Sequence, residues 1–505
     1  MKREDLRLTW LVARRELTDQ MRDWRILVPM IILVLFFPYL MNFAAFQSVG
    51  FVNQYGADLV AARIVPFFLM VVGFFPVTVS LIVALEAFVG EKERGTIEPM
   101  LSSPLADWHM YVGKLIAGSL VPLAASYISM GLYLIGLIIQ ALPWPPLDVL
   151  IQMLLLTAVQ AVLMVSAAIV ISTQATSVRA ANLLASFIVI PVSLLIQGES
   201  ALIFWGDTEV LWLAILAVVL ITILLVRLGL AHFQREALIG REIDMLNLRW
   251  MFVYFWQRFS GADQAPRLLR WLTSRQARQE YSPGLALRQD LGGILGWYRR
   301  QVFPLLKRMR VALLITVLLG LLASSLAFLY VNQAVQNAPL SEKSMQERTS
   351  EIRDLLLDGQ GQQSLNISSS WLFLNNLRAE LLILFFGMFS FGVGGIMIYG
   401  LNFSLVGAVL GAVEIAGLSA VDVFLIGILP HGIFELPSVI LVSAAALYMG
   451  VRMVTPNSSE SIGQIIIQTL AEWMQIAIGL AFPLLVIAAL IEANLTPILL
   501  YNLIK

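Results

Sequence analysis

The chain has 505 residues, of which 59% are hydrophobic and only 13% are charged. Soluble domains carry about twice that share of charge, so the composition excludes an ordinary soluble protein. Acidic and basic residues balance at 33 each, so the net charge gives no reason to expect nucleic-acid binding. Cysteine is absent, which excludes disulfides, thiolate catalysis and cysteine-ligated metals. The expected fold class is an all-α polytopic membrane protein with about eleven spans.

The first predicted element is a basic amphipathic helix over residues 6–25. Large apolar residues recur at helical spacing at Trp10, Leu17, Met21 and Trp24, and arginines accompany them at Arg14, Arg15, Arg22 and Arg25. Such a helix can lie in the cytoplasmic membrane interface, with tryptophan at the headgroups and arginine at the phosphates. A simple topogenic anchor would use the same residues, and both interpretations stay open.

Six apolar runs follow, each long enough to cross a bilayer, which takes roughly 20 residues. They are expected at about 26–46, 65–89, 115–142, 149–171, a run ending at 197–199, and 210–228. Lys92, Arg94 and Lys114 place the loop between the second and third spans on the cytoplasmic side by the positive-inside rule. Residues 1–230 are therefore expected to form one six-span domain with both ends inside.

The loop at residues 86–114 is a charged, turn-rich block. It reads Glu91-Lys92-Glu93-Arg94-Gly95-Thr96-Ile97-Glu98, then Leu101 and Pro104, then Gly113-Lys114. Thr96 can cap a short helix, and helical spacing places Glu91, Arg94 and Glu98 on one face. The run resembles the loop of type 2 ABC exporter permeases, in which E-[KR]-E-x-G-T-x-E-x-L-L-x-x-P leads to G-K. Met100 stands where that family more often has leucine.

The resemblance implies a function for this loop and for the N-terminal helix. Residues 90–114 would be the coupling segment that docks on a separate ATPase, through Glu91, Lys92, Glu93, Arg94, Gly95, Thr96 and Glu98. The helix before the first span resembles the family's interface helix. A homodimer or paired permease is implied, with ATP and Mg bound by the partner ATPase. An ordinary solvated charged loop is the alternative.

No enzyme site is expected in the chain itself. The sequence contains no G-x-x-x-x-G-K-[ST], since Gly113-Lys114 continues into Leu115. That motif supplies the loop that cradles nucleotide phosphates. Energy would therefore come from another subunit.

Residues 231–287 form a basic linker dense in arginine. Its aromatic run at 250–256 is too short to span a membrane and is flanked by arginines, which is typical of an interfacial helix on anionic lipid. RNA binding is the alternative, and a chain already held at a membrane favours lipid. Breakers at 263–266 and 282–284 place the domain boundary between them.

Residues 288–505 are expected to hold five further spans. They lie at about 311–331, twice within the glycine-rich run 380–417, and at 426–450 and 465–491, with an external loop at 332–378. Gly407 and Gly411 form a GxxxG pair, which allows close helix approach. Arg452 places the end of the fourth of these spans inside, which leaves the C-terminus outside.

This half contains Asn375-Asn376 and the run Leu429-Pro430-His431-Gly432-Ile433-Phe434-Glu435-Leu436-Pro437. His431 and Glu435 are one helical turn apart and share a face, and prolines at both ends of the run predict helix breaks. Ionisable groups in apolar surroundings turn toward a bundle interior, a cavity or each other. The expected intramembrane polar cluster consists of His431, Glu435, Glu414, Asn375 and Asn376.

Two roles stay open for this cluster. It would either contact protons or substrate, or lock the fold through satisfied hydrogen bonds, and the structural role is favoured. No metal site is expected, because the run supplies two ligands and the chain has only three histidines and no cysteine.

The two motifs and the glycine-rich spans together resemble the stage II sporulation protein M family, from about residue 285 to the C-terminus. Members are five-span membrane proteins, and the sporulation member is a scaffold for peptidoglycan-remodelling enzymes. The chain is thus expected to be the permease subunit of an ATP-driven exporter for an unidentified substrate. It would lie in the prokaryotic plasma membrane with its N-terminus cytoplasmic. The alternatives are a non-transporting scaffold or signalling module for cell-envelope remodelling, and a secondary transporter energised through His431 and Glu435.

Overall fold

The computed structural model describes residues 3–54, 58–93, 103–174, 192, 195–204, 208–232, 248–261, 293–337, 368–415, 418–455 and 462–499, and no strand occurs among them. Ten helical segments in these ranges are long and apolar enough to cross a membrane. The expected fifth span falls largely outside the described residues, and only the short apolar helix Leu195–Phe204 is described there. The prediction of an all-α polytopic membrane protein is confirmed.

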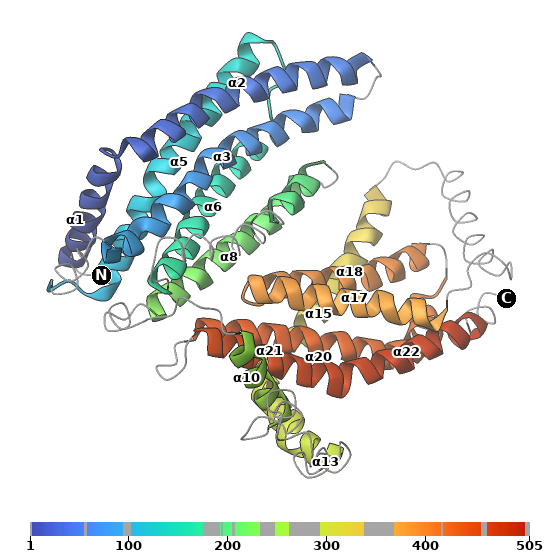
Figure 1. Cartoon of the computed structure of the whole chain (residues 1–505). Helices are drawn as coiled ribbons and strands as arrows, with labels where there is room; N and C mark the ends of the chain where they lie inside the picture. The colour runs from blue at the N-terminus through green and yellow to red at the C-terminus, as the bar shows by residue number, and fades with distance from the viewer. Residues whose placement is uncertain are drawn as a thin grey trace. The chain divides into compact units, whose positions relative to one another are not determined.

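The chain divides into two compact units, which are described separately. The first comprises Met1–Leu246 with Val454–Pro456, and the second comprises Asn247–Met453 with Asn457–Lys505. The first unit contains α1 (Arg3–Gln20), α2 (Trp24–Gln54), α3 (Asp58–Glu93), α5 (Asp107–Ile139), α6 (Leu147–Gln174) and α8 (Thr208–His232) (Figure 1).

In the first unit, α3 packs against α2, α5 and α6, and α5 also packs against α1 and α2. One buried cluster joins Leu85 and Val89 of α3 to Met110 of α5 and Val165 of α6. Ser172 of α6 adds polar contacts, since its Oγ donates to the Leu85 carbonyl at 2.7 Å and accepts from the Val89 amide at 3.1 Å. These bonds fix the end of α3 that leads into the charged loop.

The second unit begins with α10 (Leu248–Ser260), α13 (Gly293–Trp297), the π-helical turn η2 (Tyr298–Val302) and α14 (Phe303–Arg308). Its long helices are α15 (Arg310–Asn337), α17 (Ser369–Phe389), α18 (Val393–Ile415), α20 (Leu429–Val454), α21 (Ile462–Ile476) and α22 (Phe482–Asn494). Between them lie α19 (Ala420–Asp422) and the π-helical turns η3 (Val423–Ile428) and η4 (Ala477–Ala481).

The aromatic run of the predicted linker forms α10, which packs against α21. Gln475 Nε2 of α21 donates to the carbonyl oxygens of Arg258 and Phe259, both at 2.9 Å. Trp250 and Phe252 remain exposed on α10. One face of α10 thus packs against α21, while Trp250 and Phe252 lie on its exposed surface.

Two helices, α17 and α18, cover the glycine-rich run, as predicted, but the predicted bounds are wrong, because α17 already begins at Ser369, inside the predicted external loop 332–378. The GxxxG prediction is also confirmed, because α18 packs tightly on α15 through these glycines. A Cβ added at Gly407 would lie 1.9 Å from the Ser324 carbonyl oxygen, and one at Gly411 would lie 3.1 Å from Val331 Cβ. Ser324 Oγ donates to the Phe403 carbonyl at 2.8 Å across the same contact.

The helix breaks predicted at Pro430 and Pro437 are wrong. Helix α20 begins at Leu429, directly after η3, and continues through Pro437 to Val454. The Leu429 amide, just before Pro430, bonds the carbonyl of Phe424, five residues back. The same pattern precedes Pro304 and Pro483, after η2 and η4. A π turn adds one residue to the helix, and here it lets the chain continue although proline lacks an amide donor.

Candidate functional site

The motif lysine joins three helices of the first unit. Lys114 lies near the start of α5 and is 2% exposed. Its Nζ is 2.8 Å from Glu16 Oε1 of α1 and 3.2 Å from Glu91 Oε1 at the end of α3. A buried ammonium is stable only when it is paired. The Glu16–Lys114–Glu91 cluster therefore fastens α1 and the end of α3 to α5.

Gly113, which precedes this lysine, allows α1 to pack closely against α5. A Cβ added at Gly113 would lie 2.7 Å from Val12 Cβ and 3.1 Å from the Thr9 carbonyl oxygen. Thr9 and Ala13 are the buried residues of α1. Gly113 and Lys114 thus act together, since the first permits the helix contact and the second supplies its ion pair.

Helix α5 begins with a second link to α1. His109 Nδ1 accepts a hydrogen bond from the Ala106 amide at 3.1 Å, so this nitrogen carries no proton in that arrangement. His109 Nε2 lies 3.6 Å from Asp5 Oδ1, which is too long for a hydrogen bond. The imidazole thus caps its own helix and faces a carboxylate of α1.

Burial sets the electrostatics of the cluster. It raises the pKa of Glu91 above its usual range, Lys114 opposes this change, and the neighbouring Glu16 adds to it. Two carboxylates share one ammonium in this cluster, so adding a proton to one of them reduces the repulsion between them.

The other residues predicted for coupling and interface roles divide into two groups. The predicted interface residues Trp10, Arg14, Arg15, Arg22, Trp24 and Arg25 are all exposed. Of the predicted coupling residues, Glu91 faces Lys114. The side chains of Lys92 and Glu93, and all of Arg94, Gly95, Thr96 and Glu98, lie outside the described residues.

The first unit also contains a buried acid to which the sequence assigns no site role. Glu199 is 2% exposed and accepts a hydrogen bond from Gln160 Nε2 of α6 at 2.7 Å. In the sequence, Glu199 marks the polar end of the expected fifth span, which suggests contact with water. The structure instead places it inside, on the helix Leu195–Phe204.

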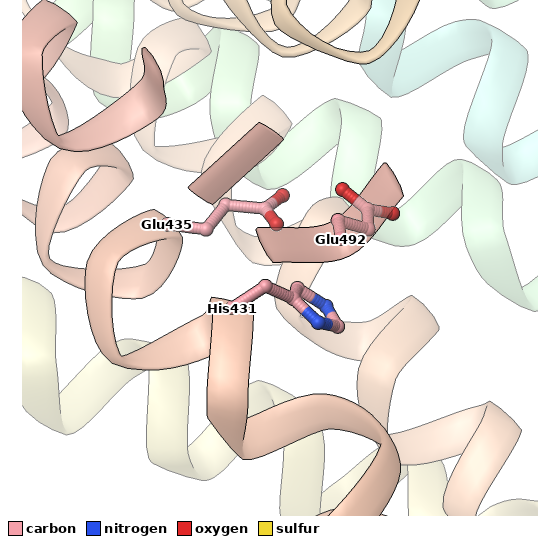
Figure 2. Close-up of side chains that lie close together, drawn as sticks. All are labelled: His431, Glu435 and Glu492. Carbon is pink, nitrogen blue, oxygen red and sulfur yellow. The ribbon is translucent and has the colours of Figure 1, made fainter. Parts of the chain in front are cut away.

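In the second unit, a polar cluster forms between α20 and α22 (Figure 2). His431, Glu435 and Glu492 each offer a ligand atom, and these atoms lie within 4.8 Å of one another. His431 and Glu435 project from successive turns of α20, and Glu492 reaches them from α22. The His431 Nδ1 atom also lies 3.1 Å from Thr496 Oγ1.

A fourth ionisable group, Glu380 of α17, is fully buried. Its Oε1 lies 2.5 Å from Ser438 Oγ of α20, and the same hydroxyl lies 2.9 Å from the Ala481 carbonyl oxygen. Because a hydroxyl carries a single proton, both contacts are fully made only when the Glu380 carboxyl is itself protonated. Glu380 therefore ties α17 and α20 to η4.

The remaining residues predicted for the polar cluster lie elsewhere. Glu414 is exposed on α18 and accepts a hydrogen bond from the Ala420 amide at 3.1 Å. Asn375 is exposed, and Asn376 is half-buried one turn before Glu380. The i, i+4 spacing from Asn376 could have drawn attention to Glu380, and the position of Glu492 in an apolar run could have drawn attention to that acid.

Comparison with known proteins gives two family matches on this chain. Residues 10–204 match the model described as ABC-2 family transporter protein, and residues 311–497 match the model described as Stage II sporulation protein M. Over 125 residues the chain is 27% identical to a "Probable ABC transporter permease protein NosY" of Pseudomonas aeruginosa, covering 25% of this chain and 43% of that relative. Both resemblances identified from the sequence motifs are confirmed.

Proposed function

We propose that this chain, which joins an ABC-2 transporter segment to a stage II sporulation protein M segment, is the membrane-spanning permease subunit of an ATP-driven exporter. The family match over residues 10–204 supports permease function. The buried Glu16–Lys114–Glu91 cluster is the observation that supports coupling to an ATPase. It links both ends of the charged loop to α1, so a push on the loop would move three helices together.

The chain would work with a separate cytoplasmic ATPase that binds ATP and Mg. The ATPase would dock on residues 90–114, where Glu93, Arg94 and Glu98 set orientation and specificity more than raw affinity. Glu91 would hold the segment in place from the inside. A homodimer or a paired permease would provide the substrate path, in a prokaryotic plasma membrane with the N-terminus cytoplasmic and the C-terminus external.

Charge reversal in the loop tests the docking. Glu93→Lys combined with Glu98→Lys should abolish co-purification of the ATPase with the tagged chain from its native membranes. Glu414→Lys is the matched control, because it reverses an exposed acid on the second unit and should leave co-purification unchanged. Equal recovery of an ATPase with the double reversal and with wild type would contradict the docking assignment.

A second candidate function is a non-transporting scaffold or signalling module for cell-envelope remodelling. The match of residues 311–497 to the sporulation family favours it. The two functions differ in a measurable way, because a scaffold would keep its ATPase and its ATP turnover but move no substrate. Reconstituted vesicles that hydrolyse ATP without exporting any of the lipids, peptides or small ions offered would favour the scaffold.

A further inference from the structure

We propose that His431, Glu435 and Glu492 bind a divalent transition-metal cation, with zinc the ion that fits them best, and that this ion fastens α20 to α22. The three ligand atoms already lie within 4.8 Å of one another (Figure 2). Ligands around a tetrahedral zinc are separated by roughly 3.4 Å, given metal–ligand distances of about 2.0–2.2 Å. Small side-chain rotations would therefore close the site.

The donor set selects among ions. One imidazole with two carboxylates suits zinc, manganese and iron, whereas magnesium and calcium prefer oxygen ligands alone. Three protein ligands also leave a fourth position for water or another group, as in open zinc sites. The sequence predicts no metal site because only His431 and Glu435 are close along the chain, and the third ligand arrives by packing of α22.

The charges around the cluster favour a cation. Among the described residues, no lysine or arginine forms an ion pair with Glu435 or Glu492, and Glu492 Oε2 is buried without a hydrogen-bond partner. Glu472 of α21 contrasts with them, because its carboxylate lies 3.3 Å from Arg452 and 3.5 Å from Arg308. Carboxylates in apolar surroundings are costly unless they are paired or bind a metal. A divalent ion would compensate both acids at once.

The histidine has the support that a metal ligand needs. Its Nδ1 lies 3.1 Å from Oγ1 of Thr496, a residue that is 6% exposed. Metal-binding histidines usually hydrogen-bond through one ring nitrogen, and such a bond fixes the ring. The π-helical turn η3 ends directly before Leu429, the first residue of α20. The ring is thus held in place before any ion binds.

Metal binding by the purified full-length chain tests the proposal. The chain would carry a tag without histidine, be stripped with a chelator in detergent, and be titrated with Zn²⁺, Mn²⁺, Mg²⁺ and Ca²⁺. We expect about one Zn²⁺ per chain by elemental analysis and a thermal midpoint that rises with Zn²⁺ concentration, with no such response to Mg²⁺ or Ca²⁺. The absence of cysteine and the presence of only three histidines keep background zinc binding low.

Isosteric variants locate the ion. Glu435→Gln and Glu492→Gln should each lower zinc affinity by about 100-fold or more, and Thr496→Val should lower it by about 10–100-fold while keeping all three ligands. Glu414→Gln, which removes an acid outside the cluster, should bind zinc as wild type does. Circular dichroism and gel filtration of each variant confirm that the chain is folded.

Two results would overturn the proposal. One is stoichiometric zinc binding that survives Glu435→Gln and Glu492→Gln unchanged, which would place the ion elsewhere. The other is a folded wild-type chain that takes up no zinc, which would mean that the cluster binds no such ion. The measurement does not depend on the ATPase, so failure of the exporter proposal would leave its outcome unchanged.

Discussion

Lys114 is a single residue whose removal should disturb three helices. Lys114→Met would take away the ammonium that Glu16 and Glu91 both contact. Breaking a buried ion pair from one side costs about 3–5 kcal/mol, because charge is left without compensation. We expect a much lower thermal midpoint and lower yield in detergent. Glu91→Gln is the matched control, since it leaves one carboxylate for one ammonium, and it should lower the thermal midpoint less than Lys114→Met does. Equal thermal midpoints of Lys114→Met and wild type would count against the cluster.

Glu91 should make stability depend on pH in a defined direction. Burial raises its pKa in the folded chain, so its stabilising contribution is present below the unfolded pKa and is lost as pH rises through the folded pKa. The thermal midpoint of Glu91→Gln minus that of wild type should therefore increase as pH rises through and above the usual pKa range of glutamate. Melting curves of both proteins over this range provide the measurement. This sign would be contradicted if the midpoint of Glu91→Gln minus that of wild type stays constant or falls as pH rises.

At the scale of elements, the contact between α15 and α18 depends on Gly407. Gly407→Ala would place a methyl group 1.9 Å from the Ser324 carbonyl oxygen, so the backbones must separate. Overpacking of this kind costs about 1–3 kcal/mol or more. Gly400→Ala is the control, because a Cβ there would meet nothing within 4 Å. Comparable thermal midpoints for the two variants would show that the helices do not pack as closely as described.

The elements that were predictable from the sequence are those that depend on local pattern. Apolar runs of sufficient length located the spans, and glycines four residues apart located the close contact of α18. The prolines were misleading, because the usual rule assumes bonds to the fourth residue back. The chain continues instead through π turns such as η3, where the Leu429 amide bonds Phe424. Pro437, in contrast, lies inside α20 itself, so a proline alone does not decide where this helix ends.

The candidate sites show the same limit. The motifs singled out Lys114 and the segment containing Glu16, but nothing in the sequence says that the two side chains meet. His431 and Glu435 were predictable because one helical turn separates them. Glu492 joins them only through the packing of α20 and α22, and Glu380 meets Ser438 in the same way. Contacts between distant segments are what the structure adds.

At the scale of the whole molecule, the distribution of arginine and lysine predicts the membrane topology. Residue 275 should be cytoplasmic and residue 353 external, by the positive-inside rule. The chain has no native cysteine, so Arg275→Cys and Arg353→Cys can be labelled one at a time with an impermeant thiol reagent in intact cells. Labelling is expected at 353 and not at 275. The reverse pattern would invert the topology and would place the loop at 90–114 outside the cell, away from ATP.

We propose that an ATPase drives this chain through the loop at residues 90–114. ATP turnover tests this in reconstituted membranes, using the ATPase recovered with the wild-type chain and then assayed alone, with wild type and with each variant. We predict that the wild-type chain stimulates turnover and that Glu93→Lys combined with Glu98→Lys removes the stimulation, while Glu414→Lys retains it. Turnover that does not respond to the chain, or that responds equally to wild type and the double reversal, would contradict the claim.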